Sequence, residues 1–198
     1  MRVSTTSSAA RPRSPWSHTA LRFLGAASLV VALLGCGAGP YGYARDYEPL
    51  GEEDDLLEHT RQTTYEDVRR DPTRFQGNEL GWFGVVDDLR SVGAGVYRLR
   101  MTYRTLRPRN LCSDETSGSC RVTVNERAGG EFDVLVRLRA TDEAPGEHRL
   151  WAGSLLRVFG KVEPELAEGD IPVIQATWYR HWPAGTYVTT GAADSMRR

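Results

Sequence analysis

The sequence predicts an all-β, mainly antiparallel fold: a small OB-like barrel, closed or partly open, with one short helix on its N-terminal side. Two observations favour this class. Five or six strand-like segments follow one another at spacings of about 10–20 residues, with glycine-rich turns between them. No helical pattern longer than about ten residues occurs in the same region.

The chain begins with a segment typical of an export signal. Residues 1–35 contain four arginines and no Asp or Glu, and they end in an apolar run over residues 23–35. That run is too short for a bilayer span, which needs about 20 apolar residues, and it fits the apolar region of a secretory signal peptide. We therefore expect residues 1–35 to be a signal peptide.

The apolar run closes on Leu33, Leu34, Gly35 and Cys36, which resembles a bacterial lipobox. In signals of that kind the cysteine thiol receives a diacylglyceryl group and becomes the mature N-terminus. Further acylation, as by palmitate, gives stable anchoring. Cys36 is thus the predicted lipidation site, and a plain signal peptide with an incidental cysteine is the alternative. Gly37 follows, and the lack of Asp there resembles outer-membrane sorting in a Gram-negative bacterium.

Residues 36–61 are expected to form an acidic, flexible tether that begins at the lipidated cysteine. Between residues 37 and 60 the sequence has seven acidic residues against one Arg, and Gly and Pro recur. Such a segment has too few apolar side chains to offset the entropy lost on ordering. The folded domain is then predicted over residues 62–190, with a disordered tail over residues 191–198.

The domain opens with a short helix and continues as strands. Thr63 and Glu66 have the spacing of a capping box, and the helix ends before Pro72. Apolar and polar residues alternate over residues 97–104, as they do in a strand with one buried face. The predicted strands span residues 80–86, 97–104, 121–126, 132–139, 155–162 and 171–179.

Cys112 and Cys120 flank a polar loop of seven residues and are predicted to form a disulfide. In an oxidising compartment outside the cytoplasm, a cysteine pair at this spacing closes a short loop. A metal site is the alternative, but neither cysteine has a second Cys or a His nearby at ligand spacing.

Three segments carry a resemblance to a known family: DPTRFQGNELGWFGVV at residues 71–86, GSLLRVFGKV at residues 153–162 and IPVIQATWYRHWP at residues 171–183. Together with the lipobox, they resemble the Slp family of starvation-inducible outer-membrane lipoproteins. The resemblance implies a β-barrel-like domain tethered to the outer membrane with a role in the envelope, and it supplies no catalytic residues. The central hairpins and the loop between Cys112 and Cys120 do not obviously match.

Residue patterns of catalytic or metal sites are missing from the sequence. It contains no Gly-x-Ser-x-Gly elbow, no His-rich ligand spacing and no phosphate-binding glycine loop. His181, between Arg180 and Trp182, is expected to be stacked or hydrogen-bonded in a structural role. We therefore predict a protein that is not an enzyme and that needs no metal or cofactor.

One surface feature has two interpretations. Arg98, Arg100 and Arg104 lie on one face of a predicted strand, and Arg137 and Arg139 lie at the end of another. If the strands are neighbours, these arginines form a basic patch for phosphate or carboxylate groups. The alternative, which we favour, is a solvated strand face whose arginines pair with Asp87, Glu131 and Asp133.

The sequence therefore predicts a non-enzymatic, lipid-anchored protein of the Gram-negative outer membrane with a structural or interaction role. The alternative is a module that binds an anionic ligand, lipopolysaccharide or a glycan, through the arginines. Expected partners are the outer membrane itself and an envelope protein or lipopolysaccharide. Nucleic acid is excluded by the net charge of −1 and by the location outside the cytoplasm.

Overall fold

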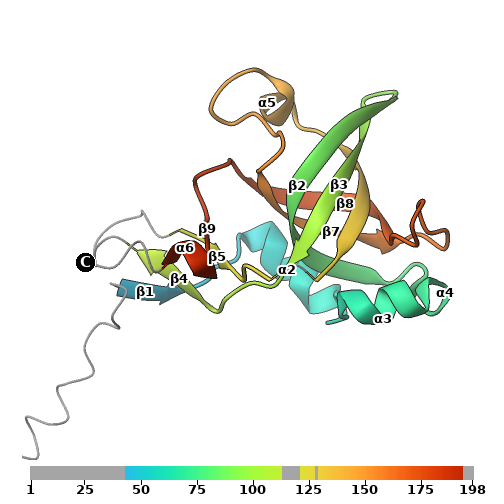
Figure 1. Ribbon diagram of the computed structural model, residues 1–198, viewed down its shortest axis with the longest axis horizontal. Coiled ribbons are helices and arrows are strands. Elements are labelled where there is room, and N and C mark those ends of the chain that lie inside the picture. Colours follow the sequence, from blue (N-terminus) through green and yellow to red (C-terminus); the bar gives the residue numbers. More distant parts are fainter. Residues whose placement is uncertain (1–42, 113–120, 128, 194–198) are drawn as a thin grey trace, which may run out of the picture. The chain divides into compact units, whose positions relative to one another are not determined.

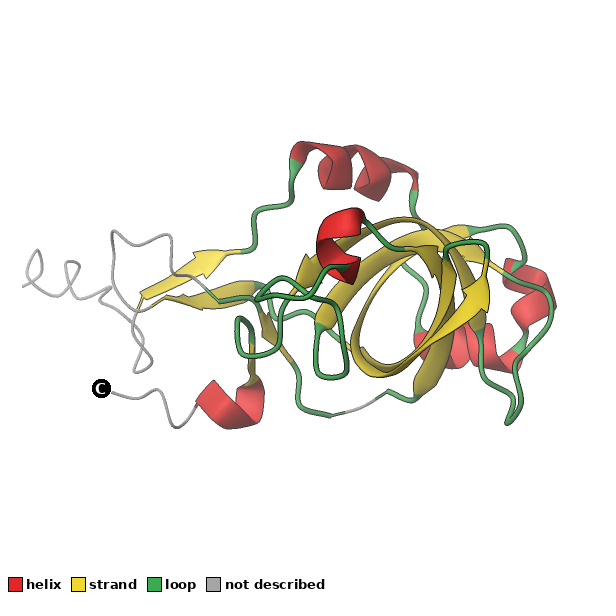
Figure 2. Cartoon of the chain, turned by 90° about the horizontal axis from the view of Figure 1, so that it is seen from above, coloured by secondary structure: helices red, strands yellow, loops and turns green. Residues whose placement is uncertain are grey.

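The computed structural model describes residues 43–112, 121–127 and 129–193. Five strands form a closed barrel, and their bounds are β2 (Glu79–Gly93), β3 (Val96–Arg104), β6 (Glu131–Arg137), β7 (Leu155–Val162) and β8 (Val173–Trp182). Figure 1 shows how they cross, and Figure 2 shows the ring that they close.

The connectivity of the barrel is OB-like. Around the ring the strands follow the order β2, β3, β6, β8 and β7, so the fourth and fifth strands of the chain exchange places. Every neighbouring pair is antiparallel except β6 with β8, which is parallel. The predicted small, mainly antiparallel, OB-like barrel is confirmed, and it is closed.

Large apolar side chains fill the barrel interior. Leu99, Met101 and Phe132 are completely buried there. A Cβ added to Gly84 would lie 2.8 Å from the ring of Phe132, so only glycine lets the ring approach the strand this closely. Gly81 makes room for the ring of Phe159 in the same way.

The strand predictions differ from the structure in several places, two of them beside the predicted sites. Instead of a strand over residues 121–126, only β5 (Thr123–Val124) is present, and it pairs in parallel with β9 (Val188–Thr189) outside the barrel. The strand expected to reach Arg139 ends two residues earlier. Arg139 instead caps α5 (Ala140–Glu143), because the backbone turns into a helix there.

The predicted short helix is present as α3 (Tyr65–Arg70), followed by α4 (Pro72–Phe75). Its cap is Thr64 and not Thr63, since the Thr64 hydroxyl accepts a hydrogen bond from the Asp67 N–H at 3.2 Å. Tyr65 and Val68 on α3 belong to the core, so this helix packs its apolar side against the barrel. The helix α4 was not predicted, nor were three further short helices, α2 (Gly51–His59), α5 and α6 (Thr190–Ala193).

The prediction of an unstructured tether over residues 36–61 is wrong for residues 43–59. This part contains β1 (Tyr43–Asp46), which pairs with β4 (Arg109–Cys112), and the helix α2 (Gly51–His59). The physical reason is that one of its acids, Glu53, has no exposed surface and pairs with two arginines of the barrel. The expected tail over residues 191–198 is likewise ordered to residue 193 in α6.

Several predictions fall outside the described residues. The signal over residues 1–35 and Cys36 lie there, as do Cys120 and the polar loop before it. The lipid anchor and the Cys112–Cys120 disulfide therefore stay predictions. Among the described helices, none has both the length and the apolar character needed to cross a membrane.

Candidate functional site

The predicted arginine face lies on the outer side of β3 and β6, which are neighbours. Arg98 Nη1 lies 3.2 Å from Asp133 Oδ2, and Arg100 Nε lies 2.5 Å from Asp133 Oδ1. Arg100 also reaches Glu131 at 3.4 Å. Two of the three acids predicted to neutralise this face therefore do so. Hydrogen bonding to Asp133, with its charge and that of Glu131, raises the pKa of Arg100 above its ordinary value.

This face contains a hollow of about 210 Å³. It is lined by three arginines and two aspartates, namely Arg90, Arg98, Arg100, Asp88 and Asp133. Two carboxylates line it with the three guanidinium groups, and Glu131, which pairs with Arg100, balances the third positive charge. Arg90 was missed because the first strand was expected to end at residue 86, whereas β2 continues and places Arg90 directly opposite Arg98. The length of the polar run after residue 86 was the available signal.

The other predicted arginines do not line the hollow. Arg104 donates to the Glu126 carbonyl, and Arg137 donates to the Ala94 carbonyl at 3.1 Å. Arg139 donates to the Tyr179 carbonyl at 2.6 Å and lies over the Tyr179 ring. A single patch of five arginines is therefore not formed, because three of them are engaged by local backbone groups.

Asp87 does not pair with an arginine either. Its carboxylate accepts a hydrogen bond from the Thr102 hydroxyl at 2.7 Å. The strand register shifts between Val86 and Asp88, so Asp87 sits at a bulge. The prediction that Asp87 neutralises the arginine face is therefore wrong.

A buried Ser–His–Asp chain was not foreseen. His181 Nδ1 lies 3.0 Å from Asp142 Oδ1, and His181 Nε2 lies 3.1 Å from Ser154 Oγ. The Tyr179 hydroxyl donates to the other Asp142 oxygen at 2.5 Å. Burial, followed by this bond to Asp142, raises the pKa of Tyr179 above its ordinary value. The three residue types match those of a hydrolase triad, and the hydrogen bonds join them in the same order, with the serine at His Nε2 and the aspartate at His Nδ1.

The burial of this chain points to a structural role. Ser154 has no exposed surface, and its hydroxyl also accepts the Trp151 N–H at 3.3 Å. A nucleophile must be reached by its substrate, and this oxygen is covered. The hydrogen bonds among Asp142, His181 and Ser154 instead link α5 to the start of β7 and the end of β8. The expectation that His181 is hydrogen-bonded is confirmed.

A second buried charge cluster holds residues 43–59 on the barrel. Glu53 lies 2.6 Å from Arg157 Nη1 and 2.9 Å from Arg180 Nη1, and it accepts the Leu50 N–H at 3.1 Å and the Tyr47 hydroxyl. Burial opposes ionisation of Glu53. The bonds from Tyr47 and Leu50 and the two arginines outweigh it, so the pKa of Glu53 lies below its ordinary value.

The same cluster changes the pKa of Tyr47, which donates a hydrogen bond to Glu53. Burial, and then the hydrogen bond to Glu53, raises the pKa of Tyr47 to about 12. Tyr47 also packs edge-on against Phe83, with ring centroids 6.0 Å apart. Tyr47 thus ties the acidic segment to the barrel through both its ring and its hydroxyl.

Neither the comparison with known proteins nor a search for metal-binding groups among the described residues identifies a function. No protein-family model matches the chain, and no curated protein matches it either. Among the described residues, no group of three or more His, Cys, Asp or Glu side chains is placed to hold a metal ion. The fold, the charged face and the N-terminal sequence are therefore the basis for inferring function.

Proposed function

We propose that the protein is a non-enzymatic outer-membrane lipoprotein of a Gram-negative envelope, with a structural or interaction role like that of the Slp family. The observation that carries this proposal is the basic, then apolar, N-terminal sequence that ends in Leu-Leu-Gly-Cys36. The closed barrel supports it, since the Slp resemblance implies a β-barrel-like domain behind the lipid anchor.

The ordered segment over residues 43–59 changes how such an anchor acts. Seven peptide units separate Cys36 from Tyr43. A fully extended chain spans about 3.5 Å per residue, so Tyr43 lies within about 25 Å of the lipidated cysteine. In an anchored protein, residue 43 would then lie near the lipid headgroups.

Replacement of the acylated thiol tests the proposal. In a Gram-negative host, Cys36→Ala is expected to abolish metabolic labelling with a fatty acid and to remove the protein from the outer-membrane fraction. Cys120→Ala is the control, because it removes a cysteine far from the signal and is expected to leave labelling intact. Labelling and fractionation that persist in Cys36→Ala would overturn the lipid anchor.

A second candidate function is binding of an anionic ligand, such as lipopolysaccharide, at the arginine face. The observation that favours it is the hollow lined by Arg90, Arg98 and Arg100. It involves β3 and β6, the second and third strands of the barrel, and OB-folds bind oligosaccharides and oligonucleotides on the face of those strands. A phosphate would compete there with Asp133 for guanidinium groups.

Retention on immobilised lipopolysaccharide at low salt tests this candidate. The double variant Arg90→Gln, Arg98→Gln is expected to lose retention and keep its fold, because Arg100 still pairs with Asp133. Arg149→Gln, an exposed arginine beyond α5, is the control. Equal retention of the double variant and the wild type would remove this candidate.

A further inference from the structure

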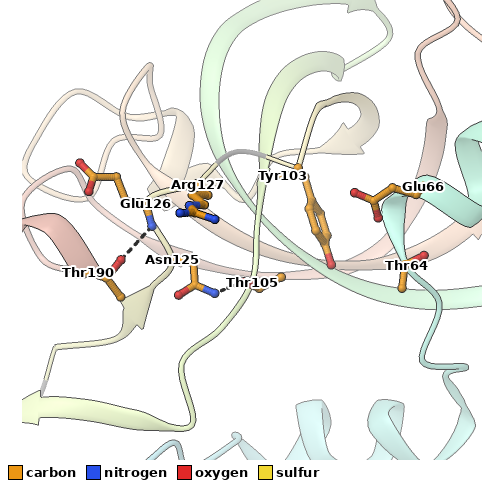
Figure 3. A pocket seen from close by; sticks show the side chains of 9 residues that line it. Thr64, Glu66, Tyr103, Thr105, Asn125, Glu126, Arg127 and Thr190 are labelled. Carbon is orange, nitrogen blue, oxygen red and sulfur yellow. Dashed lines mark hydrogen bonds between the residues drawn. The ribbon is translucent and has the colours of Figure 1, made fainter.

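A polar groove runs beside α3, and it shares no residue with the arginine face. It consists of two adjoining hollows of about 500 and 620 Å³, both lined in part by Glu66 and Gly129. The first hollow, drawn in Figure 3, also includes Tyr103, Asn125 and Arg127. We call the two together the α3 groove. Their volumes fall in the range of small-molecule sites.

The ring of Tyr103 is a fixed wall of the α3 groove. Figure 3 shows it between Glu66 and Arg127. The ring is stacked on Tyr65 with centroids 5.8 Å apart, and it meets Trp82 edge-on at 5.3 Å. A Cβ at Gly129 would overlap the Tyr103 ring, so glycine keeps this place open for it. Tyr103 as a residue is half-buried, and these contacts hold its ring in a fixed position on the lining of the first hollow.

Polar groups on both sides of the ring are available to a ligand. Glu66 and Arg127 are exposed, and neither side chain forms a hydrogen bond or ion pair within the described part of the chain. The amide of Asn125 is oriented by donation to the Thr105 hydroxyl, which leaves its oxygen free to accept. Charged and amide groups of both donor and acceptor character thus surround one aromatic face.

The charges of the α3 groove balance. Its two hollows are lined by three carboxylates and three guanidinium groups: Glu66, Glu126, Asp170, Arg69, Arg70 and Arg127. An anion or a cation therefore gains no net attraction there. Only Pro72 and Leu166 are aliphatic, so a peptide would find few pockets for apolar side chains.

We propose that the α3 groove binds an uncharged oligosaccharide. A sugar ring would pack one C–H face on Tyr103, and its hydroxyls would bond to the Glu66 carboxylate, the Arg127 guanidinium and the Asn125 oxygen. The second hollow continues past Glu66 and would hold a neighbouring sugar. This binding is independent of the lipid anchor, so its test does not depend on the proposed function.

Calorimetric titration of the full chain in detergent with tri-N-acetylchitotriose tests the proposal. The wild type is expected to bind, and Glu66→Gln and Arg127→Gln are each expected to weaken binding at least tenfold. Glu147→Gln and Arg149→Gln are matched controls, because they neutralise exposed charges beyond α5 and away from the groove. Arg98→Gln is expected to bind as the wild type does, which separates this groove from the arginine face.

Further ligands and variants decide between the outcomes. Tri-galacturonate, an anionic trisaccharide, is expected to bind more weakly than the neutral probe. Tyr103→Phe keeps the aromatic wall and is expected to retain binding, whereas Tyr103→Leu, if its circular dichroism matches the wild type, is expected to lose it. The proposal is overturned if tri-N-acetylchitotriose does not bind at millimolar concentration, if both charge variants bind like the wild type, or if a neutral acetylated tripeptide binds more tightly.

Discussion

Two carboxylates of this protein, Glu53 and Asp133, are each held between two arginines, and both are almost completely buried. Their arginines differ. The Glu53 partners Arg157 and Arg180 have side chains that are 9% and 24% exposed, whereas the Asp133 partners Arg98 and Arg100 are 43% and 35% exposed.

This difference in exposure indicates different roles for the two clusters: the Glu53 cluster holds residues 43–59 on the barrel, and the Asp133 cluster forms part of the protein surface. Arg157 lies over the rings of Phe83 and Phe159 at 4.9 Å from each centroid, so its charge has little access to water. Removing one member of such a cluster leaves an uncompensated buried charge, which is costly. The arginines at Asp133 remain partly in water, where ion pairs contribute little, and they can exchange one anionic partner for another.

The largest expected effect is that of Glu53→Gln. Loss of the carboxylate leaves Arg157 and Arg180 facing each other across β7 and β8. We expect a loss of about 3–5 kcal/mol in unfolding free energy, as for other broken buried ion pairs. Denaturant titration measures it, and limited proteolysis should show cleavage within residues 43–59.

Glu58→Gln is the control for that experiment, because Glu58 is an exposed acid of the same helix. It is expected to change stability by less than about 0.5 kcal/mol, as ordinary surface substitutions do. Equal unfolding midpoints for Glu53→Gln and Glu58→Gln would show that the Glu53 cluster does not stabilise the packing of residues 43–59 on the barrel.

Acid is expected to act through the same carboxylate. The folded-state pKa of Glu53 is below its ordinary value of 4.5, so the unfolded state binds more protons as the pH falls through this range. The stabilisation is present above pH 4.5 and is lost as the pH falls toward the folded-state pKa. Unfolding midpoints measured from pH 6 to pH 3 should decline more steeply for the wild type than for Glu53→Gln.

Tyr47→Phe is expected to have an intermediate effect. It removes one donor to Glu53, and hydrogen bonds to charged groups contribute about 1.5–3 kcal/mol. The raised pKa of Tyr47, about 12 against 10.0, also means that the unfolded state loses its proton first as the pH rises. Wild-type stability should therefore fall between pH 10 and 12, and Tyr47→Phe should fall less in thermal melts over that range.

The smallest effect is expected for Asp133→Asn. Its arginines are partly solvated, so we expect a loss of about 1 kcal/mol. The difference from the wild type should shrink in 1 M NaCl, since salt screens partly exposed pairs, while the difference for Glu53→Gln should persist. A loss at Asp133 as large and as salt-independent as that at Glu53 would erase the distinction between the two clusters.

Much of the barrel could be predicted from local pattern. The alternation over residues 97–104 places Leu99 and Met101 inside and Arg98 and Arg100 outside, as observed. Period-two alternation predicts the two faces reliably because a strand with one buried face must place its apolar residues on that face. The end of β2 was missed, since residues beyond 86 are mostly polar and their pairing depends on β3.

The polar clusters could not be predicted in the same way. Asp142, Ser154 and His181 come from three separate segments, and only the closed barrel brings them within hydrogen-bond distance. One local signal did exist for the Glu53 cluster. Arg157 lies among apolar residues in the strand Leu155–Val162, away from the exposed Lys161 near its end, and a cation at a buried strand position requires an anionic partner.

The sequence by itself determined the class of the fold, the strand faces and the expectation of an anchored envelope protein, because periodicity, turn residues and a signal segment are local properties. Only the tertiary structure decided which of the acidic side chains is buried and which stay exposed to solvent. The acids of residues 52–58 look alike in sequence, yet Glu53 alone among them is buried, since Arg157 and Arg180 stand opposite each other across two strands and need a carboxylate between them. Burial of a charge is set by the partners that the fold supplies.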